Sequence, residues 1–215
     1  MQPLALYVSI PVAAFRSPHA REYLETLPCP PPATVYGMLL SLVGEGDRWS
    51  HVGAEVALAM LSEPATSTVI RTSWRLKTDA PPGTGPNKKP DYQELLADVR
   101  LAVWVRPGAA ETASRSLAER VTAVVDRLEF PDRYGALALG ESTHLVDELR
   151  RLHSSDGDRG RVLVRDERGN LALPVWVDHV GSLGTRWGQF SLVEMSLREA
   201  PPTDAWTATV PPEAG

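Results

Sequence analysis

Three consecutive prolines, Pro30 to Pro32, constrain the fold of this chain more than any other feature. Because proline fixes φ and has no N–H, the run forms a stiff, extended segment that leads directly into an apolar helix. We expect this helix to begin at Ala33 or Thr34, with the Thr34 hydroxyl as the better cap, and to stop at Gly44. Two interpretations follow. The segment either offers a helix N-terminus to an anion such as phosphate, or only sets a core helix in place.

Composition narrows the class of protein. A chain of 215 residues with 43% hydrophobic content forms one large domain, or one domain with a small appendage. The net charge of −5 argues against nonspecific coating of nucleic acid but allows a local basic groove. One cysteine, Cys29, excludes an internal disulfide. No apolar run approaches the roughly 20 residues of a membrane span, and no basic region precedes the first apolar segment. We therefore expect a cytoplasmic protein without a membrane partner.

The order of periodic segments predicts an α+β, ferredoxin-like domain. Alternation predicts half-buried strands over 4–10, 68–77 and 99–106, and a continuous apolar run predicts a central strand over 56–61. Helical spacing predicts helices after Pro32 and over 111–128, with a helical turn at 91–98. We further expect a short strand at 136–139, a hairpin joining 161–165 to 171–177, and a last strand over 190–197. The predicted divisions are a domain over 1–140, a β-rich C-terminal part of the same unit over 141–200, and a flexible tail over 201–215.

Positive charge is concentrated between residues 68 and 90. The segment carries five cations against one anion, Asp79, and residues 79–90 form a loop rich in proline and glycine. In the alternating stretch, Ile70, Trp74 and Leu76 belong to one strand face and the cations to the other. A charged strand face is often only solvated, so a binding role and a solvated surface both remain open. The five cations are Arg71, Arg75, Lys77, Lys88 and Lys89.

No motif of a known catalytic type is present. The sequence contains no Walker A loop, dinucleotide fingerprint, nucleophile elbow or zinc-ligand spacing, so we expect no cofactor and no metal. Ser142, His144 and Asp147 lie too close in sequence to favour a hydrolytic triad. His19, between two arginines, is compatible with a proton shuttle or with an ordinary polar loop. What remains are cations, aromatic residues and a rigid loop before a helix, which suit single-stranded RNA.

Three segments resemble one known family. Phe15-Arg16-x-Pro18, the proline-rich 27–32 and the sequence ATVYGML at 33–39 are similar to the N-terminal signature of CRISPR-associated family five, in particular its DevS-like (Myxan subtype) branch. The segment LGESTHL at 139–145 resembles a second characteristic stretch, and 87–95 a weaker third one. Together the matches cover about residues 4–149, with looser similarity to 197.

The resemblance implies an RRM-like domain of the RAMP superfamily with a long β-hairpin "thumb" at about 68–105 and a small β-rich extension. Members of this family are subunits of the type I CRISPR complex Cascade, where they hold the 5′ handle of the crRNA and cap the filament of backbone subunits in antiviral defence. The implied partners are the crRNA handle and the backbone and large subunits, with target DNA nearby. The handle-binding role transfers to Arg16, Arg21, Thr34 and Tyr36, and backbone contacts to Arg71, Arg75, Lys77, Lys88 and Lys89.

Members of the family differ in whether they cleave RNA, so the presence or absence of a catalytic site separates two hypotheses. One branch of the family cleaves precursor RNA through a metal-independent Tyr/Lys/His site, for which Tyr36 and His19 are the candidates here. The hairpin of this chain lacks a Lys-His pair, which favours a non-catalytic subunit. An endoribonuclease that processes pre-crRNA, and an unrelated ferredoxin-like enzyme or binding module, are the other hypotheses.

Overall fold

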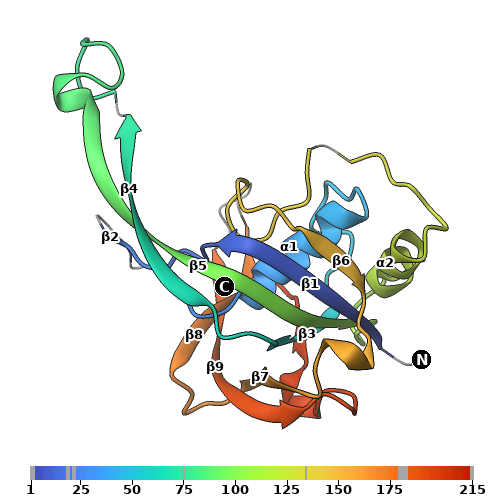
Figure 1. Ribbon diagram of the computed structural model, residues 1–215. Coiled ribbons are helices and arrows are strands. Elements are labelled where there is room, and N and C mark those ends of the chain that lie inside the picture. The colour runs from blue at the N-terminus through green and yellow to red at the C-terminus, as the bar shows by residue number, and fades with distance from the viewer. Residues whose placement is uncertain are drawn as a thin grey trace.

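The computed structural model describes residues 3–17, 20, 23–74, 76–133, 135–178 and 184–213. Two helices and ten strands follow one another along the chain (Figure 1). In order they are β1 (Leu4–Ala13), β2 (Tyr23–Leu24), α1 (Pro32–Leu42), β3 (Glu55–Met60), β4 (Ala65–Trp74), β5 (Lys88–Arg106), α2 (Leu117–Val125), β6 (Glu148–Arg151), β7 (Arg159–Arg165), β8 (Leu171–Val177), β9 (Thr185–Ser196) and β10 (Thr207–Ala208). The predicted α+β class is confirmed.

The described strands form one sheet in the order β6-β1-β5-β3-β7-β9-β8, with β2 and β4 also on β5 and β10 on β3. All pairs are antiparallel except β2 with β5. β5 is the central element, because it pairs with β1 on one side and with β3 on the other. The apolar alternation of residues 99–105 predicted this strand, and Val99, Leu101 and Val103 are fully buried.

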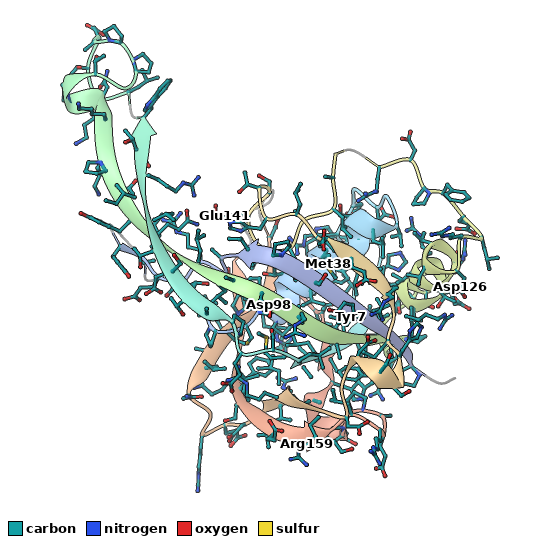
Figure 2. All side chains as sticks on the ribbon, in the orientation of Figure 1. Tyr7, Met38, Asp98, Asp126, Glu141 and Arg159 are labelled. Carbon is teal, nitrogen blue, oxygen red and sulfur yellow. The ribbon has the colours of Figure 1, made fainter. Side chains whose placement is uncertain are left out.

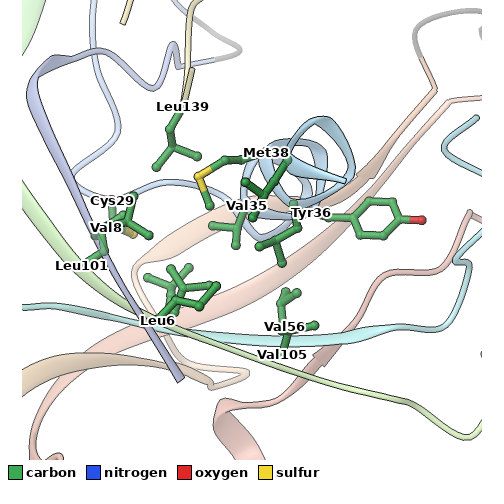
Figure 3. Packing of buried hydrophobic residues seen from close by; sticks show 14 of the residues in the cluster. Leu6, Val8, Cys29, Val35, Tyr36, Met38, Val56, Leu101, Val105 and Leu139 are labelled. Atoms are coloured by element: carbon green, nitrogen blue, oxygen red, sulfur yellow. The ribbon is translucent and has the colours of Figure 1, made fainter. Parts of the chain in front are cut away.

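Both helices contribute to the core on one face of the sheet. The alternate residues of β1 that point to this face, including Leu6 and Val8, pack near Val35 and Met38 of α1 (Figure 3). Cys29 is buried in the same cluster, and burial raises the pKa of its thiol to about 12, so the thiol stays protonated and inert as expected. Among the described residues, no helix is long and apolar enough to cross a membrane.

The C-terminal segment covers part of the other face. Trp206 is 6% exposed, belongs to a second apolar cluster with Trp104 of β5, and lies under the guanidinium of Arg106 at 4.0 Å from the ring centre. β10 extends the ladder of β3, and the hydroxyl of Thr209 donates to the carbonyl of Ala54 at 2.9 Å. The predicted flexible tail is therefore wrong for residues 203–209. The tryptophan supplies enough apolar surface to hold this segment on the sheet.

The β4–β5 hairpin projects far beyond the rest of the sheet (Figure 1). Its pairing begins at Ala97, next to a kink at Asp98, which has a left-handed backbone with φ of 60° inside β5. At this kink the hydroxyl of Ser62 donates to the carbonyl of Asp98 at 2.6 Å and accepts the N–H of Arg100 at 3.0 Å. A single side chain thus satisfies two backbone groups of β5 beside the kink.

Several predicted elements are wrong, and pairing explains each case. Residues 91–98 are part of β5 rather than a helical turn, because β4 and β1 both pair along them. At 136–139 there is only one bridge, Ala138 to Leu145, and the edge strand is β6 instead. β7 and β8 do not pair as a hairpin, since β9 lies between them. The second helix covers 117–125, a shorter range than predicted, and begins at a capping box between Ser116 and Glu119.

Candidate nucleic-acid interface

A cavity of about 420 Å³ lies beside the N-terminal half of α1. Three segments that are far apart in sequence meet there: the end of β1 with Phe15 and Arg16, the first turns of α1, and the loop at Gly140 and Glu141. β8 adds Pro174 and Val177. The proline run holds α1 against this opening, because Pro30 to Pro32 are buried and extend straight into the helix. Two of the segments predicted to act together, 15–40 and 139–145, are therefore neighbours in the structure.

The Gly140 loop is fixed to the strand that precedes the cavity. Gly140 has φ of +96°, and a Cβ atom there would lie 2.6 Å from the carbonyl oxygen of Ala14, so the loop passes too close for any other residue. The backbone N–H of Ala14 donates to Nδ1 of His144 at 3.1 Å. Burial lowers the pKa of His144, which keeps this nitrogen available as an acceptor. His144 thus has a structural part in the cavity wall.

The start of α1 differs from the prediction. The N-cap is Pro31, with no side-chain cap, and the helix begins at Pro32, so Thr34 is inside the first turn rather than at the cap. The N–H groups of Thr34 and Val35 both donate to the carbonyl of Pro31, at 2.9 and 3.1 Å, and Pro32 has no N–H. This leaves few backbone donors for an anion at the helix end. Thr34 nevertheless lines the cavity, as does Arg16.

Tyr36 is not a surface residue. Its side chain is fully buried on α1 (Figure 3). Its ring centre lies 5.9 Å from that of Trp176. The hydroxyl donates to the carbonyl oxygen of Arg48 at 2.6 Å. Burial raises the pKa of Tyr36, so it carries no charge near neutral pH. The core encloses the side chain, so in this structure Tyr36 presents no exposed group for the predicted RNA contact or acid–base role.

Arg48 lines the same cavity and was not predicted from the sequence. Its guanidinium lies 4.9 Å from the ring centre of Trp176, which also packs against Trp49. Burial lowers the pKa of Arg48, while Tyr36 and Asp178 act in the opposite direction. Its Nε is enclosed and has no hydrogen-bond partner in the described part of the chain. The pair Arg48–Trp176 spans 128 positions, so no local pattern could have linked them.

The hairpin cations have partners that charge counting did not reveal. Nη1 of Arg71 donates to the Gln93 side chain and lies 3.2 Å from Oε2 of Glu141, whose other oxygen accepts from Gln93 at 2.8 Å. Glu141, labelled in Figure 2, thereby ties the middle of the hairpin to the cavity wall. Nζ of Lys89 lies 3.5 Å from Oδ1 of Asp91. Lys77 and Lys88 are exposed near the tip.

The opposite face of the hairpin is apolar and open to solvent. Ile70 pairs with Tyr92 and Trp74 with Lys88, and the three apolar side chains are 67%, 46% and 71% exposed. Tyr23 of β2 stacks on Tyr92 with 6.4 Å between ring centres. The alternation predicted an apolar face correctly, but no layer of the described chain covers it.

Some predicted site residues, namely His19, Arg21 and Arg75, lie outside the described residues. Within the described ranges, no cluster of three or more His, Cys, Asp or Glu side chains could hold a metal ion. The predicted residues that the structure does bring together are Arg16 and Thr34 in the cavity, with Arg71 joined to it through Glu141.

The chain is similar in sequence to one known protein and in fold to two solved structures. No model of a protein family matches the chain. The "CRISPR-associated protein Cas5" of Myxococcus xanthus (strain DK1622) is 45% identical over 186 residues, which cover 86% of this chain and 87% of that protein. A solved structure described as a "CRISPR RNA-guided surveillance complex" has a TM-score of 0.60 at 15% identity, covering 95% of this chain and 96% of its own. A second, "Crystal structure of Cas protein", has a TM-score of 0.53 at 12% identity, with 91% and 95% covered.

Proposed function

The chain belongs to the Cas5 family of CRISPR-associated proteins, as the resemblance of its sequence predicted, and from this premise we propose that it is an RNA-binding subunit of a type I Cascade complex. In this role it holds the 5′ handle of the crRNA and caps the filament of backbone subunits, in the cytoplasm and in antiviral defence. Its partners are the crRNA, the backbone and large subunits, and target DNA nearby. The DevS-like branch stays a prediction.

The strand order supports a finer assignment of the fold. In the sequence β1-α1-β3-β5-α2-β6, the four strands lie in the order β6-β1-β5-β3 and all pairs are antiparallel. This is the arrangement of two split βαβ units, which we assign as the ferredoxin-like, RRM-like domain of a RAMP protein. The β4–β5 hairpin is then the thumb, and β7 to β9 form the β-rich extension.

The cavity beside α1 is the observation that carries the proposal. It combines an arginine held on an aromatic ring, Arg48 on Trp176, with a second arginine, Arg16, at its rim. Guanidinium groups bind phosphate through several N–H donors, and rigid walls reduce the entropy lost on binding. Its volume lies within the range of about 300–1,000 Å³ typical of ligand pockets. A strand end of RNA suits such a site better than a duplex does.

The thumb supplies a second set of contacts. Lys77 and Lys88 are exposed at its tip, and Trp74 and Tyr92 offer rings on one face. Cations next to exposed aromatic side chains favour a single strand, whose bases stack while its phosphates pair with charge. Because Arg71 is bonded to Glu141 and Gln93, we assign it to orienting the thumb rather than to RNA contact.

We propose that this subunit does not cleave RNA through Tyr36. The buried hydroxyl of Tyr36 already donates to a backbone carbonyl, and burial raises its pKa, so the phenol stays protonated near neutral pH and cannot accept a proton as a base. A general acid or base must lie within hydrogen-bond reach of the group on which it acts. Precursor processing is then the task of a separate enzyme.

The test is co-purification from cells that express this chain, the other subunits encoded beside it and the matching CRISPR repeat. We expect an intact RNA that carries the repeat-derived 5′ end to remain bound to the assembly. Arg48→Gln should lower the yield of this RNA, whereas Arg168→Gln, at an exposed position in the turn before β8, should not. Assembly without RNA would refute the proposed role.

Cleavage is tested separately with the pure chain, repeat RNA and a chelator. We expect no specific product. Cleavage that His19→Ala abolishes would contradict the non-catalytic assignment.

A further inference from the structure

A second cavity, of about 370 Å³, lies on the other side of Arg48. Both cavities are lined by Gly37 and Arg48, so they form one groove that crosses the outer side of α1. Thr34 lines the first cavity and Ser41 the second. The seven-residue step from Thr34 to Ser41 corresponds to a rise of about 10 Å along the helix axis. This length is comparable with the span of one dinucleotide step.

Gly37 has no structural reason to be glycine. It lies inside α1 with an ordinary helical backbone, and a Cβ atom built on it would have no neighbour within 4 Å. Glycine destabilises a helix interior relative to alanine, so the core alone would favour alanine here. Gly46 is the other described glycine with neither a positive φ nor a neighbour within 4 Å, and it also lines the second cavity. Both residues keep the groove shallow and free of side chains.

The charges along the groove favour an anion. Of its three carboxylates, Glu141 pairs with Arg71 at 3.2 Å and Glu45 with Arg120 at 2.7 Å. The third, Asp132, lines the second cavity. Three arginines also line the groove: Arg16 the first cavity, Arg133 the second and Arg48 both. Arg48 therefore lies at the junction of the two cavities, beside the bare surface of Gly37.

We propose that two consecutive nucleotides of single-stranded RNA occupy the two cavities, with the phosphate that links them passing over Gly37 beside Arg48. This inference rests on the proposed RNA-binding function and assigns the path of the strand within it. Glycine is required because the sugar–phosphate backbone approaches the helix closely, as happens where other proteins hold phosphates against main chain. Trp176 fixes the guanidinium so that its remaining N–H groups face the phosphate.

The test compares stability and affinity in the same variants. Gly37→Ala should raise the Tm by about 2 °C, because it removes a helix-interior glycine without a clash, yet weaken RNA binding. Gly37→Leu, which blocks the groove, should weaken it by about tenfold or more. Arg48→Gln should weaken binding and reduce the salt slope by about one, while the control Arg168→Gln should change neither.

The probe is a series of repeat RNAs shortened one nucleotide at a time and titrated against the assembled complex. We expect the difference between the unaltered protein and Gly37→Leu to vanish once the two groove nucleotides are removed. A difference that persists through the whole series, or an unchanged affinity of Gly37→Leu, overturns the groove assignment alone. Loss of a protein subunit at unchanged RNA affinity also overturns it, because a protein would then fill the groove. Absence of specific RNA binding by the unaltered protein overturns both proposals.

Discussion

Replacement of Tyr36 by phenylalanine tests whether the hydroxyl of this residue has a structural or a catalytic role. The substitution keeps the ring against Trp176 and removes only the hydroxyl, whose bond to the Arg48 carbonyl measures 2.6 Å. A hydrogen bond of this kind contributes about 0.5–1.5 kcal/mol, and a carbonyl left without a partner costs about 1–3 kcal/mol. We expect the free energy of unfolding to fall by about 1–2 kcal/mol and the Tm by about 2–8 °C. RNA affinity should change by less than about threefold, because the guanidinium of Arg48 stays on Trp176.

Urea titration and calorimetry measure the first effect, and binding to repeat RNA the second. Tyr92→Phe is the matched control, since the ring of Tyr92 is 46% exposed on the thumb. Its stability should change by less than about 0.5 kcal/mol. Unaltered stability of Tyr36→Phe together with a loss of RNA binding or of RNA cleavage would refute this assignment, because the hydroxyl would then act on the ligand.

Three further predictions concern the thumb, the C-terminal segment and a loop carboxylate. Combined Lys88→Ala and Lys89→Ala should lower the salt slope of RNA binding by about one per lost phosphate contact, and an unchanged slope would exclude the thumb from the interface. Trp206→Ala should lower the free energy of unfolding by about 3–5 kcal/mol in urea, since the side chain is 6% exposed; a loss below about 1 kcal/mol would show that the segment is not anchored. A backbone N–H in its own loop and the guanidinium of Arg120 hold the pKa of Glu45 below its ordinary value of 4.5. The stabilisation by ionised Glu45 is therefore present above pH 4.5 and lost as the pH falls through the lowered pKa. The free energy of unfolding of Glu45→Gln should therefore fall less steeply below pH 4.5 than that of the unaltered protein, and equal slopes in the two proteins would contradict this.

Local periodicity predicted the elements that bury one face. The alternation over 4–10 and 99–106 became β1 and the inner half of β5, because each strand packs one side against the helices. Tyr36 lies in the apolar helix predicted after the proline run, and this pattern by itself favours burial. The assignment of Tyr36 to RNA followed the family signature instead, which does not distinguish a buried residue from an exposed one.

Long-range pairing is what the sequence could not supply. The prediction of a helical turn at 91–98 is wrong because the residues that pair with this segment, on β4 and in the loop at Glu141, are tens of positions away in sequence. The place of β9 between β7 and β8 depends likewise on tertiary pairing rather than on any turn signal. Arg48 could not be predicted as a site residue, because its contact with Trp176 of β8 forms only in the folded chain.

The β4–β5 hairpin is made partly from the outer half of the same strand that crosses the centre of the sheet, and this limits how such an arm can change length. β5 has 19 residues and only one kink, at Asp98, so the hydrogen-bonded ladder transmits its direction from the body to the tip. Adding one residue to each strand would turn every distal side chain to the other face, exchanging Trp74 and Tyr92 with the polar network. An arm that keeps its apolar face on one side can therefore lengthen or shorten only by two residues on each strand, in steps of about 7 Å.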